Sequence, residues 1–273
     1  MRSIFITALV TISLAVGAVY WLGRPLSGDT GFCTTRVGTT VVETDLEQTK
    51  WATQMAAIGA KRDLPPRATT IAIATAYQES KMRNIDYGDR DSLGLFQQRP
   101  SQGWGSDQQV TDPVYAINAF YDGLVKVKNY ETMEITVAAQ KVQRSGFPDA
   151  YAQHEANARA LASALRGYSP AAFTCSVKEQ AGSLSELKSY LKDFWPDSKV
   201  TSNNETHTMS LGVGAKDAPV RGWAIAHFLV GNAAEFGIAT VSFDDMRWDS
   251  NNSKGEWVPT DGISQKQVTF TLN

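Results

Sequence analysis

The hydrophobic pattern between residues 45 and 167 predicts a series of amphipathic helices. Apolar residues recur there three and four positions apart, which places them on one face of a helix. Asp45, Pro65-Pro66 and Asp112-Pro113 stand where helices begin, and Gly167 stands where the last one ends. We therefore expect helices over 46–59, 66–79, 114–127 and 149–166.

A different pattern follows, in which helical and strand-like segments alternate. The segment 167–183 contains Pro170 and several Gly and Ser residues, which is typical of a linker. Beyond it we expect helices over 184–195 and 219–236, and strands over 208–213, 238–243 and 267–272. The pattern thus predicts a mainly α domain over 33–175, followed by a small α/β domain over 184–273.

The first 24 residues predict a transmembrane helix ahead of both domains. Residues 4–22 contain no charged side chain, and a helix needs ~20 residues to span a bilayer. The small residues Val16-Gly17-Ala18 also resemble a signal-peptide cleavage site. The apolar run continues past them to Trp21, which favours an uncleaved anchor. Arg2 keeps the short N-terminus in the cytoplasm, so we expect both domains to be extracytoplasmic, or secreted if the signal is cleaved.

Charge excludes one class of partner. The chain has 26 Lys and Arg residues against 28 Asp and Glu residues, and its net charge is -2. A nucleic-acid-binding domain would carry a strongly basic surface instead. We therefore expect no nucleic-acid partner, whereas a neutral glycan is compatible with this charge.

The two cysteines, Cys33 and Cys175, stand at the two ends of the predicted helical domain. A disulfide between them would join those ends, and such bonds persist in oxidising compartments. Two free thiols are the alternative. The cysteines and the three histidines lack metal-ligand spacings such as Cys-x-x-Cys or His-x-x-x-His, so we expect no metal and no cofactor.

The helix over 66–79 ends in Glu79-Ser80, and the acid has apolar or small neighbours such as Ile71 and Ala76 on its helix face. Apolar surroundings disfavour an ionised carboxylate, and so do the carbonyl groups at a helix C-terminus. Both effects raise the pKa of Glu79, as a general acid at neutral pH requires. The alternative is an ordinary solvated helix end.

A second motif, Gly94-Leu95-Phe96-Gln97, follows the Glu-Ser pair. In this order the two motifs resemble the lysozyme-like superfamily, in particular soluble lytic transglycosylases and goose-type lysozymes. Those proteins carry Glu-Ser at a helix end and Gly-Leu-Met-Gln in the sugar cleft. The resemblance implies a lysozyme-like fold, with Glu79 as the acid that protonates the glycosidic oxygen between N-acetylmuramic acid and N-acetylglucosamine. The polar residues that it implies for orienting the acid or the sugars are Ser80, Gln97 and Gln98.

A third family motif, Ala-Tyr-Asn-Ala-Gly, opens a later helix in lytic transglycosylases. The nearest segment here is Val142-Gln143-Arg144-Ser145-Gly146. This alignment puts Gln143 where the family has a Tyr that contacts the acid and the substrate, so we expect Gln143 to contact substrate. The same replacement motivates an alternative function, in which the domain has lost catalysis and binds the cell wall or takes part in envelope assembly.

The segment 83–104 has little periodicity and many polar residues, so we expect a loop that lines the cleft. A possible second carboxylate is one of Asp86, Asp89 and Asp91, and the alternative is that these residues serve turn formation. Trp104 either stacks on a sugar face or fills core space.

The C-terminal domain shows a second resemblance. Residues 221–230, 236–241 and Arg247-Trp248 are similar to domains of bacterial cell-wall proteins related to zinc D-alanyl-D-alanine peptidases. Those enzymes carry His-x-His zinc ligands on a final strand, whereas the last strand here reads Gln267-Val268-Thr269-Phe270-Thr271. The resemblance therefore implies a domain without zinc that acts as a spacer or binds an envelope protein.

These motifs predict a membrane-anchored, extracytoplasmic enzyme that cleaves the β-1,4 bond of peptidoglycan glycan strands. Glu79 is expected to act first as the acid and then as the base. The sequence leaves open whether water or the sugar's own 6-hydroxyl completes the reaction, that is, whether the enzyme is a lysozyme or a lytic transglycosylase.

Overall fold

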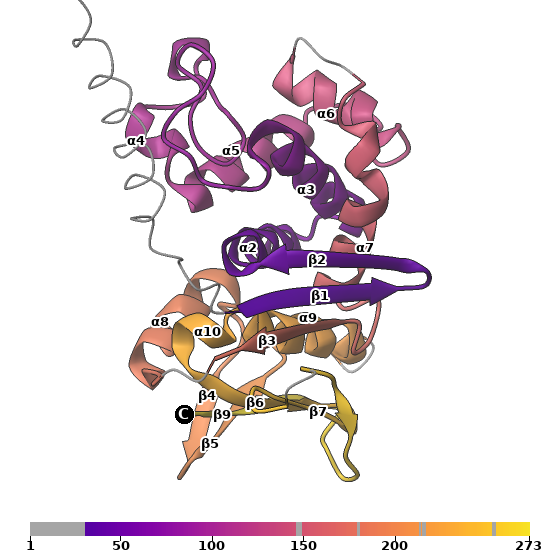
Figure 1. The fold of residues 1–273 in the computed structure, drawn as a ribbon, viewed down its shortest axis with the longest axis vertical. Coiled ribbons are helices and arrows are strands. Elements are labelled where there is room, and N and C mark those ends of the chain that lie inside the picture. The colour runs from indigo at the N-terminus through magenta and orange to yellow at the C-terminus, as the bar shows by residue number, and fades with distance from the viewer. Residues whose placement is uncertain (1–30, 146–148, 179–180, 213, 215–216, 253–254) are drawn as a thin grey trace, which may run out of the picture.

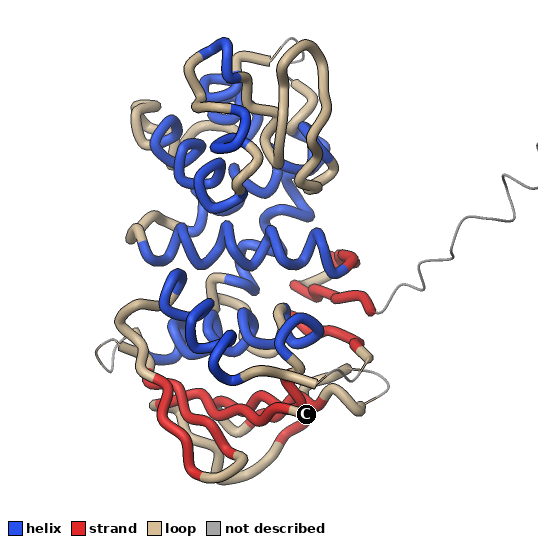
Figure 2. Tube along the Cα trace, turned by 90° about the vertical axis from the view of Figure 1, so that its left-hand side faces the viewer, coloured by secondary structure: helices blue, strands red, loops and turns tan. Residues whose placement is uncertain are grey.

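The structure is a computed structural model that describes residues 31–145, 149–178, 181–212, 214, 217–252 and 255–273. Helices occupy one end of the molecule, a six-stranded sheet occupies the other, and a three-stranded sheet lies between them (Figure 1, Figure 2). Helix accounts for 44% and strand for 20% of this mixed α/β architecture. The expected fold class, a mainly α domain with a small α/β addition, is therefore wrong.

The helical end is built from segments whose beginnings are encoded locally. The Asp45 side chain accepts a hydrogen bond from the Gln48 N–H, and the Gln48 side chain accepts one from the Asp45 N–H. This capping box begins α2, and Pro66 at the first position begins α3, as predicted. The elements of this end are α2 (Leu46–Lys61), α3 (Pro66–Ser80), η1 (Pro100–Gln102), α4 (Asp107–Val110), α5 (Pro113–Leu124), α6 (Ile135–Gln143), η2 (Ala152–His154) and α7 (Glu155–Leu165).

The three-stranded sheet joins the two ends of the helical region. β1 (Gly31–Val37) pairs antiparallel with β2 (Thr40–Asp45) on one side and with β3 (Phe173–Val177) on the other. Cys33 lies directly opposite Cys175 in the β1–β3 register. The two form a disulfide across 142 residues of sequence, which confirms the predicted pairing.

The six-stranded sheet has the strand order β4-β5-β9-β6-β7-β8, and its neighbouring strands are antiparallel. Helix α9 (Ala218–Gly231) contacts this sheet as well as α2 and α7, and it is buried along nearly its whole length. Gly222 allows the close approach, because a Cβ there would lie 2.0 Å from the Phe243 ring. The other elements are α8 (Leu184–Phe194), β4 (Val200–Asn203), β5 (Thr206–Ser210), α10 (Ala233–Phe236), β6 (Ile238–Phe243), β7 (Met246–Asp249), β8 (Val258–Pro259) and β9 (Gln267–Leu272).

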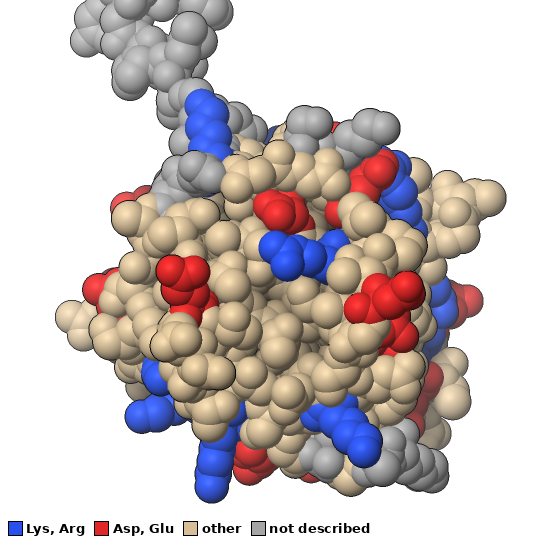
Figure 3. Space-filling model, turned by 90° about the horizontal axis from the view of Figure 1, so that it is seen from below, with Lys and Arg blue, Asp and Glu red and all other residues tan. Residues whose placement is uncertain are grey.

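The face seen from the six-stranded end carries charges of both signs, scattered over a mostly uncharged surface (Figure 3). No single-sign patch covers the part of this face that the structure describes.

The three-stranded sheet is the main difference from the sequence-based expectation. The expected linker over 167–183 contains β3, and β1 and β2 precede the first predicted helix. Only part of β1 follows the alternation of buried and exposed positions that marks a strand, because three consecutive residues in it are buried. The pairing of β1 with β3 joins distant parts of the chain, so the local sequence pattern does not predict it.

The transmembrane helix expected over 1–24 lies outside the described residues. Within the part of the chain that is described, no helix is long and apolar enough to cross a membrane.

Three helices differ in extent from the prediction. The helix expected over 114–127 begins at Pro113 and ends at Leu124. The helix expected over 149–166 begins with the turn η2 and becomes α-helical at Glu155. The helix expected over 219–236 breaks at Asn232, whose side chain donates a hydrogen bond to the Phe228 carbonyl oxygen at 2.7 Å and competes with the helical pattern. The strand expected over 208–213 is shifted to Thr206–Ser210, whereas the strands over 238–243 and 267–272 are confirmed.

Candidate active site

Glu79 is the second-last residue of α3, and the chain turns away directly after it. Lys81 adopts a left-handed backbone conformation with φ of 55°. The buried Ser80 hydroxyl donates a hydrogen bond to the Leu95 carbonyl oxygen at 2.8 Å and accepts one from the Arg83 N–H at 3.0 Å. Ser80 therefore holds the following loop against the helix end and does not line the cleft.

Glu79 is half-buried and has two hydrogen-bonding side chains beside it. The Tyr151 hydroxyl donates to Glu79 Oε1 at 2.6 Å, and the Gln143 amide also forms a hydrogen bond with the carboxyl group. Burial has the largest effect and raises the pKa of Glu79, while the two hydrogen bonds act in the opposite direction. The carboxyl group thus retains its proton to higher pH than an exposed Glu, and donors are already in place for its ionised form.

Tyr151 contacts Glu79, and the sequence did not predict this residue for the site. It lies between α6 and η2, and its side chain is fully buried. Burial and the nearby Glu79 raise the pKa of Tyr151, so its hydroxyl stays protonated and acts as a donor. The signal that could have pointed to it is the triplet Ala150-Tyr151-Ala152, because its Ala-Tyr pair resembles the start of the motif Ala-Tyr-Asn-Ala-Gly.

Gln143, the last residue of α6, does not replace the tyrosine. Its Nε2 donates a hydrogen bond to the Phe96 carbonyl oxygen at 2.7 Å, which connects α6 to the second motif. The structure therefore brings both Gln143 and Tyr151 to Glu79, and Gln143 also lines the cleft in front of the acid.

The motif Gly94-Leu95-Phe96-Gln97 forms a tight turn. Its Gly has φ of 75°, and a Cβ there would lie 2.1 Å from the Val110 carbonyl oxygen, so the turn requires glycine. Gln97 lines the cleft with Glu79, and its amide donates to two carbonyl oxygens of its own loop at 3.2 and 3.3 Å. Gln98 is buried and donates to the Ala116 carbonyl oxygen at 3.2 Å, so it anchors the loop to α5 instead of facing the cleft.

The three loop aspartates have different surroundings. Asp86 is exposed and does not line the cleft. Asp89 lines the cleft, and its side chain is 93% exposed to solvent. Asp91 accepts hydrogen bonds from Arg99 Nε and the Ser101 N–H, both at 2.8 Å, and these hold the pKa of its carboxyl group well below the usual range. Asp91 thus stabilises the loop conformation. Asp89 is the aspartate of this loop that lines the cleft together with Glu79.

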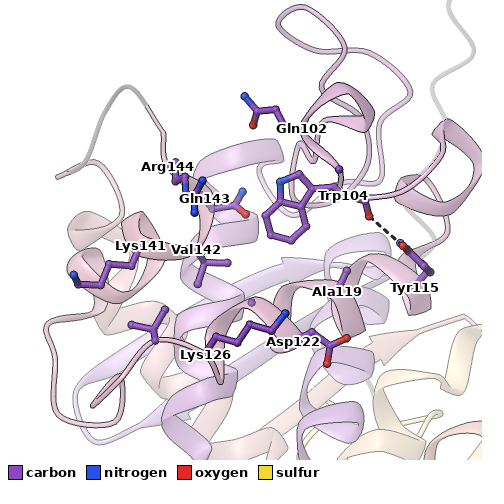
Figure 4. Close-up of a pocket in the computed structure, with 13 residues that line it drawn as sticks. Gln102, Trp104, Tyr115, Ala119, Asp122, Lys126, Lys141, Val142, Gln143 and Arg144 are labelled. Carbon is purple, nitrogen blue, oxygen red and sulfur yellow. Dashed lines mark hydrogen bonds between the residues drawn. The ribbon is translucent and has the colours of Figure 1, made fainter.

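The cleft beside Glu79, of ≈ 550 Å³, continues into a second cavity of ≈ 830 Å³. Gln102, Trp104, Gln143 and Arg144 line both, so the two cavities form one groove. The Trp104 indole is half-buried and projects into the second cavity (Figure 4). A continuous groove with an aromatic side chain in its wall suits an extended polymer with apolar sugar faces.

No protein-family model matches the chain, and no curated protein matches it either. Within the residues that the structure describes, no group of three or more His, Cys, Asp or Glu side chains could hold a metal ion. A functional assignment must therefore be argued from the geometry of the groove and its acid, because a fold alone does not define an activity.

Proposed function

We propose that this chain is an extracytoplasmic enzyme that cleaves the β-1,4 glycosidic bond of peptidoglycan, with Glu79 as its acid–base group. The observation that carries the proposal is the pairing of Tyr151 with Glu79 at the side of a long groove. Protonation of a leaving oxygen requires an acid with a raised pKa, and burial raises the pKa of Glu79. Tyr151 and Gln143 supply hydrogen bonds to its ionised form.

In the first step, protonated Glu79 gives its proton to the glycosidic oxygen, and the bond between that oxygen and the anomeric carbon breaks. The leaving sugar departs as an alcohol, and positive charge develops on the ring that remains. Tyr151 and Gln143 stabilise the carboxylate that Glu79 has become, because both hydrogen bonds favour its ionised form.

In the second step, the 6-hydroxyl of the same sugar attacks the anomeric carbon and its proton passes to the Glu79 carboxylate. This closes a 1,6-anhydro ring and restores the acid. The surroundings of the loop aspartates support this route over one with a second carboxylate. Asp86 lies outside the cleft, Asp91 is bound to Arg99 and Ser101, and Asp89 is almost fully exposed.

The location is supported by the disulfide, because a buried Cys33–Cys175 bond persists in an oxidising compartment. The alternative of a binding protein without catalysis depended on Gln143 replacing the tyrosine. Tyr151 removes the basis of that argument, since a tyrosine does contact Glu79.

Digestion of purified peptidoglycan tests the proposal. Glu79→Gln keeps the shape of the side chain and removes its acidic proton, so we expect release of soluble fragments to fall by about 10²-fold or more. The matched control is Asp86→Asn, which makes the same change of charge at an exposed position outside the cleft. Equal release by wild type and a folded Glu79→Gln protein would contradict the assignment.

A further inference from the structure

The second cavity of the groove lies between the C-terminal part of α5 and the end of α6 (Figure 4). Trp104 and Gln143 connect it to the cleft in front of Glu79. A polymer bound at the acid therefore reaches this cavity without leaving the groove.

Three cations line the second cavity, namely Lys126, Lys141 and Arg144. All three are exposed, and none has an ion-pair partner among the described residues. The cavity is also lined by one acid, Asp122, which is paired with Arg62 at 2.6 Å. The second cavity, called the cationic arm of the groove below, is therefore positively charged. The chain as a whole has a net charge of -2.

Binding of a neutral sugar chain does not require unpaired cations in the cavity, because sugars are recognised by hydrogen bonds and stacking. Like charges near one another repel, and a bound anion relieves that repulsion. The guanidinium group of Arg144 also has the fork geometry that matches a carboxylate. The occupant that this arm fits is thus a chain carrying carboxylates beside the glycan.

We propose that the Lys126–Lys141–Arg144 arm binds carboxylates of the peptide stem attached to the glycan strand, so that the protein recognises stem-bearing glycan. This inference rests on the proposed function, because it takes the strand cleaved at Glu79 as the source of the stem. It assigns to the arm a role in selecting substrate and no part in the chemical step.

The test measures binding of two soluble peptidoglycan fragments to the full chain carrying Glu79→Gln. One fragment keeps its peptide stems. The other has had them removed by an amidase, and the lactyl carboxylates that this cleavage exposes have been converted to neutral amides. We expect tighter binding of the stem-bearing fragment. Adding Lys126→Gln and Lys141→Gln should weaken that binding by about 3- to 30-fold and leave the stem-free fragment unaffected, because exposed ion pairs have small individual effects.

Lys192→Gln is the matched control. Lys192, like Lys141, is an exposed lysine in the last turn of its helix, but it lies on α8 and does not line the groove. This variant should bind both fragments as the Glu79→Gln parent does, and the preference for stems should fade in high salt.

The remaining outcomes separate the two proposals. Equal affinity for both fragments would overturn the stem proposal and leave glycan binding intact. Failure to bind either fragment would overturn the proposed function and this inference with it. A lysine-dependent preference for an anionic phosphodiester wall polymer over the stem-bearing fragment would replace the stem as the occupant.

Discussion

The Tyr151 hydroxyl lies 2.6 Å from Glu79 Oε1 and joins two residues that are 72 positions apart in the chain. Burial and the neighbouring acid keep the tyrosine protonated, so it is a permanent donor. Burial raises the pKa of Glu79, and the tyrosine opposes that rise. This balance suits the proposed general acid, because burial favours the protonated form and the hydrogen bond favours the anion that proton transfer would leave.

We predict that Tyr151→Phe leaves a folded protein with a slower reaction and a shifted pH profile. Loss of a hydrogen bond to a charged group should lower kcat by about tenfold or more. Because this hydrogen bond lowers the pKa of Glu79, its removal raises that pKa, and the loss of activity on the alkaline side moves to higher pH. The measurement is the pH dependence of kcat for both proteins.

Tyr168→Phe is the control for this change, since Tyr168 is 55% exposed and lies outside the groove. If Tyr151→Phe lowered activity without moving the alkaline limb, the tyrosine would have a packing role and no influence on the proton of Glu79.

Local signals predict part of this architecture. The starts of α2 and α3 follow from the Asp45–Gln48 capping box and from Pro66, because both interactions join residues that are close in sequence. The apolar neighbours of Glu79 on its own helix follow from the helix periodicity in the same way. These features are predictable because they depend on neighbours within one or two turns.

The rest depends on contacts between distant segments. β3 could not be recognised in the expected linker, because its partner β1 lies at the other end of the helical region. Tyr151 was missed for a related reason. A motif gives the order of residues, whereas the length of the segment between α6 and Tyr151 decides whether the tyrosine reaches Glu79. Gln98 is the opposite case. Its place beside Gln97 led us to expect a residue that faces the sugar, but its side chain is buried against α5.

We predict that loss of the Cys33–Cys175 disulfide lowers stability. The bond constrains a loop of 142 residues of sequence separation in the unfolded chain, and its removal should reduce the free energy of unfolding by about 2–5 kcal/mol. Both positions are buried, so Cys33→Ala with Cys175→Ala is the suitable variant. Denaturant unfolding with and without a thiol reductant checks this.

The reductant provides the internal control for the disulfide. It should lower the stability of wild type and leave the double alanine variant unchanged. A wild-type midpoint that does not respond to reductant, with the bond shown by mass spectrometry to be reduced, would contradict the prediction.

We predict that His227 makes the fold sensitive to acid. It is fully buried among Trp223, Trp257 and Phe173, and its Nδ1 lies 2.8 Å from the Ala164 carbonyl oxygen. Burial lowers the pKa of His227 to about 4 from the usual value of 6.5. Below pH 6.5 the unfolded chain therefore binds a proton that the folded protein excludes. Stability should fall between pH 6.5 and about 4, by about 3 kcal/mol in total.

The free energy of unfolding, measured across this pH range, tests the role of His227. His227→Asn keeps a donor for the carbonyl oxygen of Ala164 and removes the titration, so its stability should depend less steeply on pH than that of wild type. His154→Asn is the comparison. Burial lowers the pKa of His154 too, but this histidine is only half-buried, so its replacement should change the slope less than His227→Asn does. Equal slopes for wild type and His227→Asn would assign the acid sensitivity to other groups.

The last prediction concerns the product, and it depends on how the loop aspartates are held. A hydrolase with a second carboxylate needs that group fixed at roughly 5 to 9.5 Å from the acid. Asp91 is committed to Arg99 and Ser101, and Asp89 is 93% exposed. No aspartate of this loop is therefore fixed where it could position a water molecule for attack. The remaining nucleophile is the 6-hydroxyl of the sugar. We therefore expect muropeptides with 1,6-anhydro ends that contain no oxygen from labelled solvent.

Mass spectrometry of a digest in ¹⁸O-labelled water separates the two routes. Asp89→Asn should retain activity within about threefold, because a side chain that is 93% exposed, with its ion pair to the exposed Arg90 at 4.0 Å, has little part in general base catalysis. Reducing ends that carry the label, together with a loss of about 10²-fold in Asp89→Asn, would make Asp89 the base and the protein a lysozyme. Labelled ends with an active Asp89→Asn protein would mean that water attacks without help from this aspartate, and Glu79 would then act as the base toward water in place of the sugar hydroxyl.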